Sequence, residues 1–166
     1  MHQEILFPRE KAALYPLLAQ QIAALAEDAQ PLSTLANASA LLYEALPDIN
    51  WAGFYLASGD MLHLGPFQGR TACMQIPFGR GVCGTAAATR QVQVVQDVQR
   101  FPGHIACDSA SRSEIVLPIW VDGRLFGVLN IDSPSLNRFT EGDADGLTAF
   151  VAALTRSVDF AHGLLK

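Results

Sequence analysis

Three cysteines have the most distinctive chemistry in this chain, and all of them, Cys73, Cys83 and Cys107, lie within 35 residues. Thiols grouped in this way serve as metal ligands, as redox groups or as small buried hydrophobes. Structural zinc sites favour cysteine pairs two to four residues apart, whereas the spacings here are 10 and 24. His104, three residues before Cys107, adds little to a metal site. We therefore expect no metal, and the thiols remain either core residues or redox groups.

Cys107 and Cys83 have different neighbours along the chain. Cys107 belongs to a polar loop beside Asp108 and Arg112, where burial of a thiol is not favoured, so we expect it to be accessible. Arg112 would favour its thiolate form and Asp108 would oppose that. Cys83 stands between a valine and a glycine and is most readily interpreted as a core residue. Redox chemistry would also need a second thiol within reach.

Two acidic residues, Glu114 and Asp132, mark the outer ends of two strand-like runs that are joined by Asp122-Gly123. An Asp-Gly pair between apolar runs predicts a hairpin turn, so the two carboxyl groups should face each other at its open end. Paired acids in a partly apolar site raise each other's pKa, and one then holds a proton that it can donate. The alternative is two solvated acids at strand ends, which the residues allow equally well.

The segment Gly79-Arg-Gly-Val-Cys-Gly84 has the spacing of dinucleotide-binding glycines. That function requires a full helix, a second parallel strand and an acid about 20 residues further on. Here the helical run at residues 85–90 is short, and Asp97 follows Gly84 by only 13 residues. We predict that these glycines form a tight turn into a short helix.

The elements that must position these groups follow from hydrophobic periodicity. Apolar residues at helical spacing predict helices at residues 10–28, 34–45 and 140–160, the last opened by a capping box at Thr140 and Asp143. Short runs rich in aromatic and β-branched residues predict strands at residues 51–57, 61–65, 91–95, 114–120 and 125–132. Together they indicate an α+β fold. We expect a single domain over residues 1–166, with N-terminal helices at about 10–46, sheet and active-site loops at about 50–134 and a C-terminal helix at about 140–163.

Composition argues against several classes of function. Half of the 166 residues are hydrophobic, which is typical of a compact, ordered domain. The net charge is −5 and Lys and Arg form no cluster, so we expect no nucleic-acid partner. No uncharged apolar run approaches the roughly 18 residues of a membrane span, and the N-terminus has no secretory pattern. With an odd number of cysteines, these features predict a cytoplasmic protein with reduced thiols and no membrane partner.

Several long motifs, in the right order, resemble those of free methionine-(R)-sulfoxide reductases, a family of stand-alone GAF domains. The motifs are Asn50-Trp-Ala-Gly-Phe-Tyr55, Gly65-Pro-Phe-Gln-Gly69, Ala72-Cys73, Ile76-Pro-Phe-Gly-Arg-Gly-Val-Cys-Gly84, His104-Ile-Ala-Cys107-Asp108, Ser113-Glu-Ile-Val-Leu-Pro118 and Gly127-Val-Leu-Asn-Ile-Asp-Ser-Pro134. The likeness runs over about residues 51–150 and includes the cysteine spacing. It implies a GAF-like antiparallel sheet with helices packed on its faces, usually in a homodimer.

The resemblance implies an enzyme, an oxidoreductase that reduces free L-methionine (R)-sulfoxide to L-methionine with a disulfide as acceptor. Cys107 would be the nucleophile that attacks the sulfoxide sulfur and becomes a sulfenic acid, and Cys73 would resolve it as a disulfide. Cys83 would be an auxiliary thiol near the substrate. Thioredoxin would reduce the disulfide, so no bound cofactor is expected.

The same resemblance assigns the other site residues. Glu114 and Asp132 would hold the sulfoxide oxygen and help to protonate it, and Trp51 with Tyr55 would form the apolar wall for the methyl group. At position 130 the resemblance implies an acid that favours the substrate ammonium, but this chain has Asn130, which accepts a hydrogen bond without charge. The alternative function is a small-molecule-binding or redox-sensing GAF module without catalysis, because most GAF domains are sensors.

Overall fold

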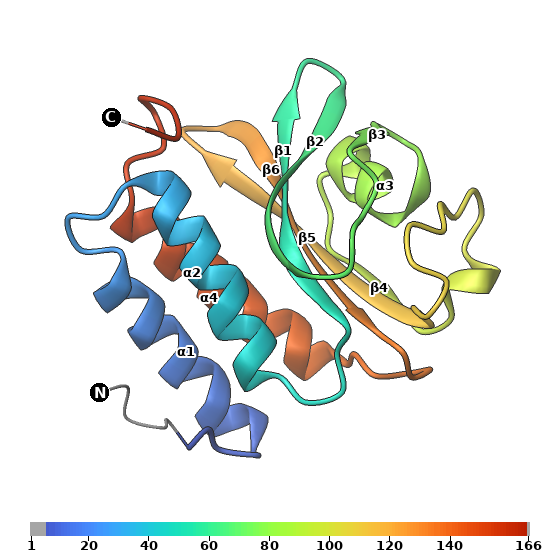
Figure 1. Cartoon of the computed structure of the whole chain (residues 1–166), viewed down its shortest axis with the longest axis horizontal. Coiled ribbons are helices and arrows are strands. Elements are labelled where there is room, and N and C mark those ends of the chain that lie inside the picture. Colours follow the sequence, from blue (N-terminus) through green and yellow to red (C-terminus); the bar gives the residue numbers. More distant parts are fainter. Residues whose placement is uncertain (1–5, 166) are drawn as a thin grey trace.

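The computed structural model describes residues 6–165, so residues 1–5 and 166 of the expected domain lie outside the described part. In chain order the elements are α1 (Lys11–Leu25), α2 (Pro31–Ala45), β1 (Trp51–Ser58), β2 (Met61–Gly69), β3 (Gln75–Pro77), α3 (Gly81–Thr89), β4 (Gln93–Val95), the 3₁₀ turn η1 (Val98–Arg100), β5 (Ser113–Val121), β6 (Arg124–Ser133) and α4 (Glu141–Ser157). The strands form one antiparallel sheet in the order β3-β2-β1-β6-β5-β4. Helices α1, α2 and α4 lie on one side of it and α3 lies on the other (Figure 1). The predicted α+β class is confirmed.

The alternation of side chains along each strand gives the sheet two apolar cores. In β1, Ala52 and Phe54 belong to the core with α1, α2 and α4, whereas Trp51 and Tyr55 belong to the core with α3. Strands β5 and β6 alternate in the same way. Residues of β5 and β6 that enter the first core are Ile115, Leu117, Ile119, Leu129 and Ile131, and those that enter the second are Val116 and Val128. The position of a residue along its strand therefore decides which of the two cores its side chain joins.

The β5–β6 hairpin forms as the Asp122-Gly123 pair predicts. Both turn residues have positive φ, 50° and 75°, which matches a tight two-residue hairpin turn. The ladder pairs Glu114 directly with Asp132. The two acids consequently face each other at the end of the hairpin away from the turn, as expected.

A buried carboxylate at the start of α4 joins that helix to α1. Asp143 closes the predicted capping box by accepting the backbone N–H of Thr140 at 2.8 Å. The same carboxylate accepts from Lys11 Nζ and from the Tyr15 hydroxyl, both at 2.7 Å. Gly146 lets the Tyr15 ring lie against the helix, because a Cβ there would overlap the ring. These contacts fix how α1 packs on α4.

Several predicted helix boundaries were wrong. The helix expected from residue 34 begins at Pro31, because proline is favoured in the first helical turn, where its missing N–H costs nothing. Helix α1 ends at Leu25 and not at residue 28, and Pro16 lies inside it without ending it. Helix α4 ends at Ser157 and not at 160–163. There the chain becomes extended, and Phe160 packs on Phe126 with 4.6 Å between ring centroids.

Two strands also differ from their predicted lengths. Strand β2 continues past residue 65 to Gly69, and its pairing with β1 has an irregularity between Gly53 and Tyr55. Strand β4 covers only Gln93–Val95, the residues that pair with β5. Among residues 6–165, no helix has the length and apolar character needed to cross a membrane.

Candidate active site

A narrow cavity opens on the α3 side of the sheet. Its volume is about 40 Å³, enough for about three water molecules at roughly 10–15 Å³ each. Strands β1, β5 and β6, the first turn of α3 and loop 101–112 line it. Seven of the eight predicted site residues contribute to the wall: Trp51, Tyr55, Cys83, Cys107, Glu114, Asn130 and Asp132. Within the described part of the chain, no group of three or more His, Cys, Asp or Glu side chains is placed to hold a metal ion.

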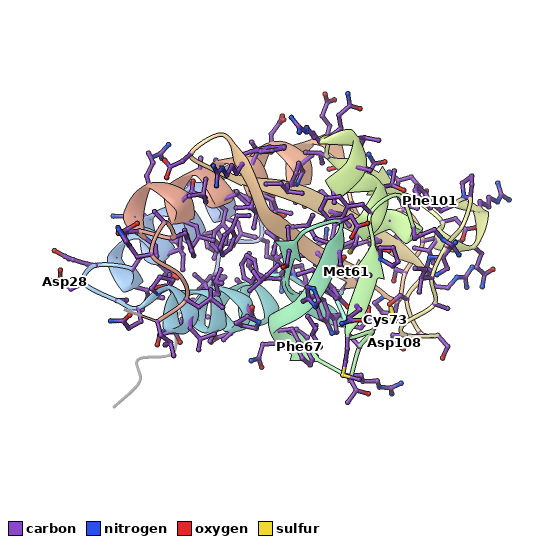
Figure 2. The ribbon with its side chains drawn as sticks, turned by 90° about the horizontal axis from the view of Figure 1, so that it is seen from above. Asp28, Met61, Phe67, Cys73, Phe101 and Asp108 are labelled. Atoms are coloured by element: carbon purple, nitrogen blue, oxygen red, sulfur yellow. A yellow bond between two sulfur atoms is a disulfide. The ribbon has the colours of Figure 1, made fainter. Side chains whose placement is uncertain are left out.

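Cys73, the eighth residue, reaches the cavity through a covalent bond. It forms a disulfide with Cys107, and the two Cα atoms are 5.4 Å apart. The bond joins the segment after β2 to loop 101–112 at the margin of the molecule (Figure 2). Tyr55 holds the first segment, since its hydroxyl donates to the carbonyl oxygen of Cys73 at 2.9 Å. Because Cys107 lines the cavity, one of the two residues of the disulfide belongs to the cavity wall.

Glu114 is buried and Asp132 is partly buried, so the two acids are not solvated strand ends. Glu114 is 7% exposed, and burial raises its pKa well above the usual value, with a further rise from Asp132. Burial also raises the pKa of Asp132 to about 7, although a hydrogen bond from Ser111 Oγ at 3.3 Å opposes this. Neighbouring acids in such a site retain a proton near neutral pH. The pair is therefore able to protonate an oxygen atom in the cavity.

Two aromatic side chains form an apolar wall. Trp51 and Tyr55 stack with 5.8 Å between ring centroids, and Trp51 also stacks on Phe67 at 5.1 Å. The indole N–H of Trp51 donates to the carbonyl oxygen of Arg70 at 3.1 Å, which orients the ring. A methyl group in the cavity would meet a flat, fixed apolar surface.

Asn130 points from β6 into the same cavity, two residues before Asp132. Its side chain lies close enough to Asp132 to lower the pKa of that carboxyl. Its Oδ1 is buried and has no hydrogen-bond partner in the described chain. Leaving a buried acceptor unpaired costs about 1–3 kcal/mol, so this oxygen would gain from a donor in the cavity.

A polar network that sequence reasoning did not assign to the site supports Asp132. Asn50 Nδ2 donates to Asp108 Oδ2 and to Ser111 Oγ, both at 3.2 Å, and Ser111 Oγ donates in turn to Asp132. His104 also lines the cavity; burial lowers its pKa, and its Nδ1 has no partner among the described residues. Asn50, Asp108 and His104 stand within the motifs that suggested the family, which was a usable signal. Nothing in the sequence marked Ser111 as a site residue except its position in a polar loop.

The Gly-rich segment turns the chain into α3, which begins at Gly81 and not at the predicted residue 85. Gly79 and Gly81 have φ of 78° and 62°, a backbone conformation that suits glycine. Gly84 lies against the carbonyl oxygen of Pro77, where a Cβ would overlap it. Helix α3 has nine residues, and the described sheet contains only antiparallel pairs. This is not the strand–helix–strand unit that holds a dinucleotide.

Cys83, the third residue of α3, is a core residue, as its sequence neighbours suggested. It is 4% exposed and remains a free thiol. Its Sγ lies 3.7 Å from Glu114 Oε1, within hydrogen-bonding distance for sulfur. Cys83 is thus both a core residue and a neighbour of the acid pair.

Comparison with known proteins agrees with this geometry. A GAF domain family model matches residues 32–159. Free methionine-R-sulfoxide reductase of Escherichia coli is 62% identical over 125 residues, which cover 75% of this chain and 76% of that protein. This chain belongs to the free methionine-R-sulfoxide reductases, a family of GAF domains.

Two further comparisons extend the likeness beyond residues 51–150. Protein YtsP of Bacillus subtilis is 56% identical over 152 residues, covering 90% of this chain and 93% of that protein. The X-ray structure of free methionine-R-sulfoxide reductase from Neisseria meningitidis in complex with its substrate has a TM-score of 0.89 at 46% identity, over 95% of each chain. The shared fold therefore includes the N-terminal helices.

Proposed function

We propose that this chain reduces free L-methionine (R)-sulfoxide to L-methionine. The observation that carries the proposal is the Cys73–Cys107 disulfide at a cavity that is also lined by the acid pair Glu114 and Asp132. Family membership supports it, because the E. coli relative bears the name of this activity. A sensing or small-molecule-binding GAF module has no evident need for a redox pair beside protonated acids.

The thiol chemistry proceeds in two balanced steps. In the first step the Cys107 thiol attacks the sulfoxide sulfur, and the sulfur–oxygen bond of the substrate breaks. Cys107 takes the oxygen and becomes a sulfenic acid, and methionine leaves. The Cys73 thiol then attacks the sulfenic sulfur, the disulfide forms and water leaves. The bond between these two cysteines in the structure supports this pairing and corresponds to the oxidised end of the cycle.

The acid pair makes the sulfoxide reactive. Sulfur becomes a better electrophile as its oxygen gains a proton, so the first step needs a protonated acid close to that oxygen. Glu114 and Asp132 both have raised pKa values, that of Asp132 being about 7. The rate should therefore fall as the pH rises through the range in which the pair loses its proton.

The rest of the cavity accounts for the rest of the substrate. Trp51 and Tyr55 contact the methyl group with their stacked rings. The unpaired Oδ1 of Asn130 accepts a hydrogen bond from the ammonium group. This places the substrate sulfur between the aromatic wall and Cys107.

Thioredoxin is the proposed reductant, because two electrons must reach the disulfide before the next turnover. The position of the bond at the margin of the molecule favours access by a dithiol protein (Figure 2). A homodimer in the cytoplasm, with no bound cofactor, completes the proposal on the basis of the family resemblance. Light scattering of the purified protein would test the dimer.

Counting thiols before and after a single turnover tests the proposed activity. Fully reduced protein mixed with methionine (R)-sulfoxide and no reductant should form methionine and lose two thiols for each methionine formed. Cys107→Ser should form none, whereas Cys73→Ser should complete one turnover and fail to recycle with thioredoxin. Cys83→Ser removes the third thiol as a matched control, and this variant should still lose two thiols for each methionine formed. Bound sulfoxide with an unchanged thiol count would instead indicate a sensing module.

A further inference from the structure

Cys83 takes no part in the disulfide, yet it is in contact with the acid pair. Its S–H group lies 3.7 Å from Glu114 Oε1. Among the described residues, no other side chain hydrogen-bonds to Glu114. A thiol is a weak hydrogen-bond donor, but among the described residues it is the side chain that donates to this buried acid.

The surroundings of Cys83 keep its thiol protonated. Burial raises its pKa well above the usual value, and the charges of Glu114 and Asp132 raise it further. The thiolate is the nucleophile in disulfide exchange, so a thiol held in the S–H form is poorly suited to resolve a sulfenic acid. A hydrogen bond to a carboxyl oxygen requires that protonated form.

The Gly-rich segment explains how Cys83 comes to lie beneath β5. It stands between Gly81, where a Cβ would come within 3.2 Å of the Ile105 side chain, and Gly84, which abuts the carbonyl oxygen of Pro77. Side chains at these two positions would push α3 away from its neighbours. The glycine spacing therefore has a packing function, which is to bring the third residue of α3 to Glu114.

We propose that Cys83 is a positioning residue whose S–H donates to Glu114 Oε1 and leaves the proton of the acid on Oε2. A protonated carboxyl group carries its hydrogen on one oxygen, and a donor at the other oxygen selects that arrangement. The O–H of Glu114 is then presented to the sulfoxide oxygen. The effect on catalysis rests on the proposed function, whereas the hydrogen bond itself does not.

Infrared spectroscopy tests the hydrogen bond independently of activity. In the oxidised protein Cys83 carries the only S–H group, because the other two of the three cysteines form the disulfide. Its S–H stretching band should lie at a hydrogen-bonded frequency and move to that of a free thiol in Glu114→Ala. Loss of the band in Cys83→Ser assigns it. A band unmoved by Glu114→Ala overturns the proposal, whatever the protein's activity.

Kinetics test the positioning effect. Cys83→Ala should lower kcat about tenfold, the equivalent of one net hydrogen bond, with little change in KM. Because the hydrogen bond from Cys83 lowers the pKa of Glu114, its loss should also move the high-pH limb of the profile upward. Cys83→Ser should recover most of the lost rate, since a hydroxyl also donates.

Other outcomes separate the alternatives. Equal losses in the serine and alanine variants with an unmoved pH profile indicate packing alone and overturn the proposal. Loss of thioredoxin-driven recycling in both variants, with one turnover intact, identifies Cys83 as the resolving thiol and also overturns it. If wild-type protein forms no methionine, the proposed function fails and the infrared result alone decides the role of Cys83.

Discussion

Asn130 places a neutral amide in the cavity where the family resemblance implies an acid. A carboxylate there would hold the substrate ammonium more strongly, because charge-assisted hydrogen bonds are roughly twice as strong as neutral ones. It would also add a third acid beside Glu114 and Asp132. In the proposed reaction the amide would therefore give weaker substrate binding and less repulsion among the acids.

Asn130→Asp should lower the KM for methionine (R)-sulfoxide about tenfold, the equivalent of ~1.4 kcal/mol. The added charge should raise the pKa of Asp132 above about 7, so the high-pH limb of the rate profile should move upward. Steady-state kinetics across the pH range measure both effects. Asn137→Asp, the same change at an exposed position outside the cavity, should alter neither. An unchanged KM in Asn130→Asp would remove this residue from the substrate site.

At the scale of elements, the packing of α1 on α4 depends on Asp143. Burial alone would raise its pKa, but hydrogen bonds from Lys11, Tyr15 and the Thr140 backbone hold it below its usual range. A carboxyl whose folded-state pKa is lowered adds stability that is present above its unfolded-state pKa of about 3.9. That stability is lost as the pH falls through the lower folded-state value.

Asp143→Asn should lower the free energy of unfolding by about 1–3 kcal/mol at neutral pH, because two cations and a tyrosine lose their charged acceptor. The difference from wild type should shrink at a pH below about 3.9, where the carboxyl group takes up its proton first in the unfolded chain. Urea unfolding at the two pH values measures this. Glu141→Gln, an exposed acid in the same helical turn, should change stability by less than about 0.5 kcal/mol. An equal loss at both pH values would contradict the charge-based explanation.

Elements with local signals were the predictable part of the fold. The turn of the β5–β6 hairpin and the capping box of α4 depend on residues within four positions, and the turn also placed Glu114 opposite Asp132. The contact between Asp143 and Lys11 joins residues 132 positions apart. The thiol of Cys83 meets Glu114 across 31 positions. Such contacts arise from tertiary packing, so the acid pair could be predicted and the groups that tune it could not.

At the scale of the whole molecule, the disulfide closes a loop that contains β3, α3, β4 and η1. Its cysteines are 34 positions apart, and the chain-entropy model gives about 4 kcal/mol of stabilisation for a loop of roughly that length. The coupling works in both directions. Folding favours formation of the disulfide by the same free energy by which the disulfide stabilises the folded chain. Each proposed turnover would therefore move the protein between a more stable oxidised state and a less stable reduced state.

Reduction of the disulfide should lower the free energy of unfolding by about 4 kcal/mol. For a domain of this size that corresponds to a Tm about 8–16 °C lower. Urea unfolding and thermal melting with and without a phosphine reductant measure the change. Cys73→Ser is the matched control. Its unfolding midpoint should equal that of the reduced wild type and should be the same with and without the reductant. If the unfolding midpoint of the wild type does not change with the reductant, the reduced, unfolded chain already keeps the segments of Cys73 and Cys107 close together. The disulfide would then record the redox state without changing the stability of the fold.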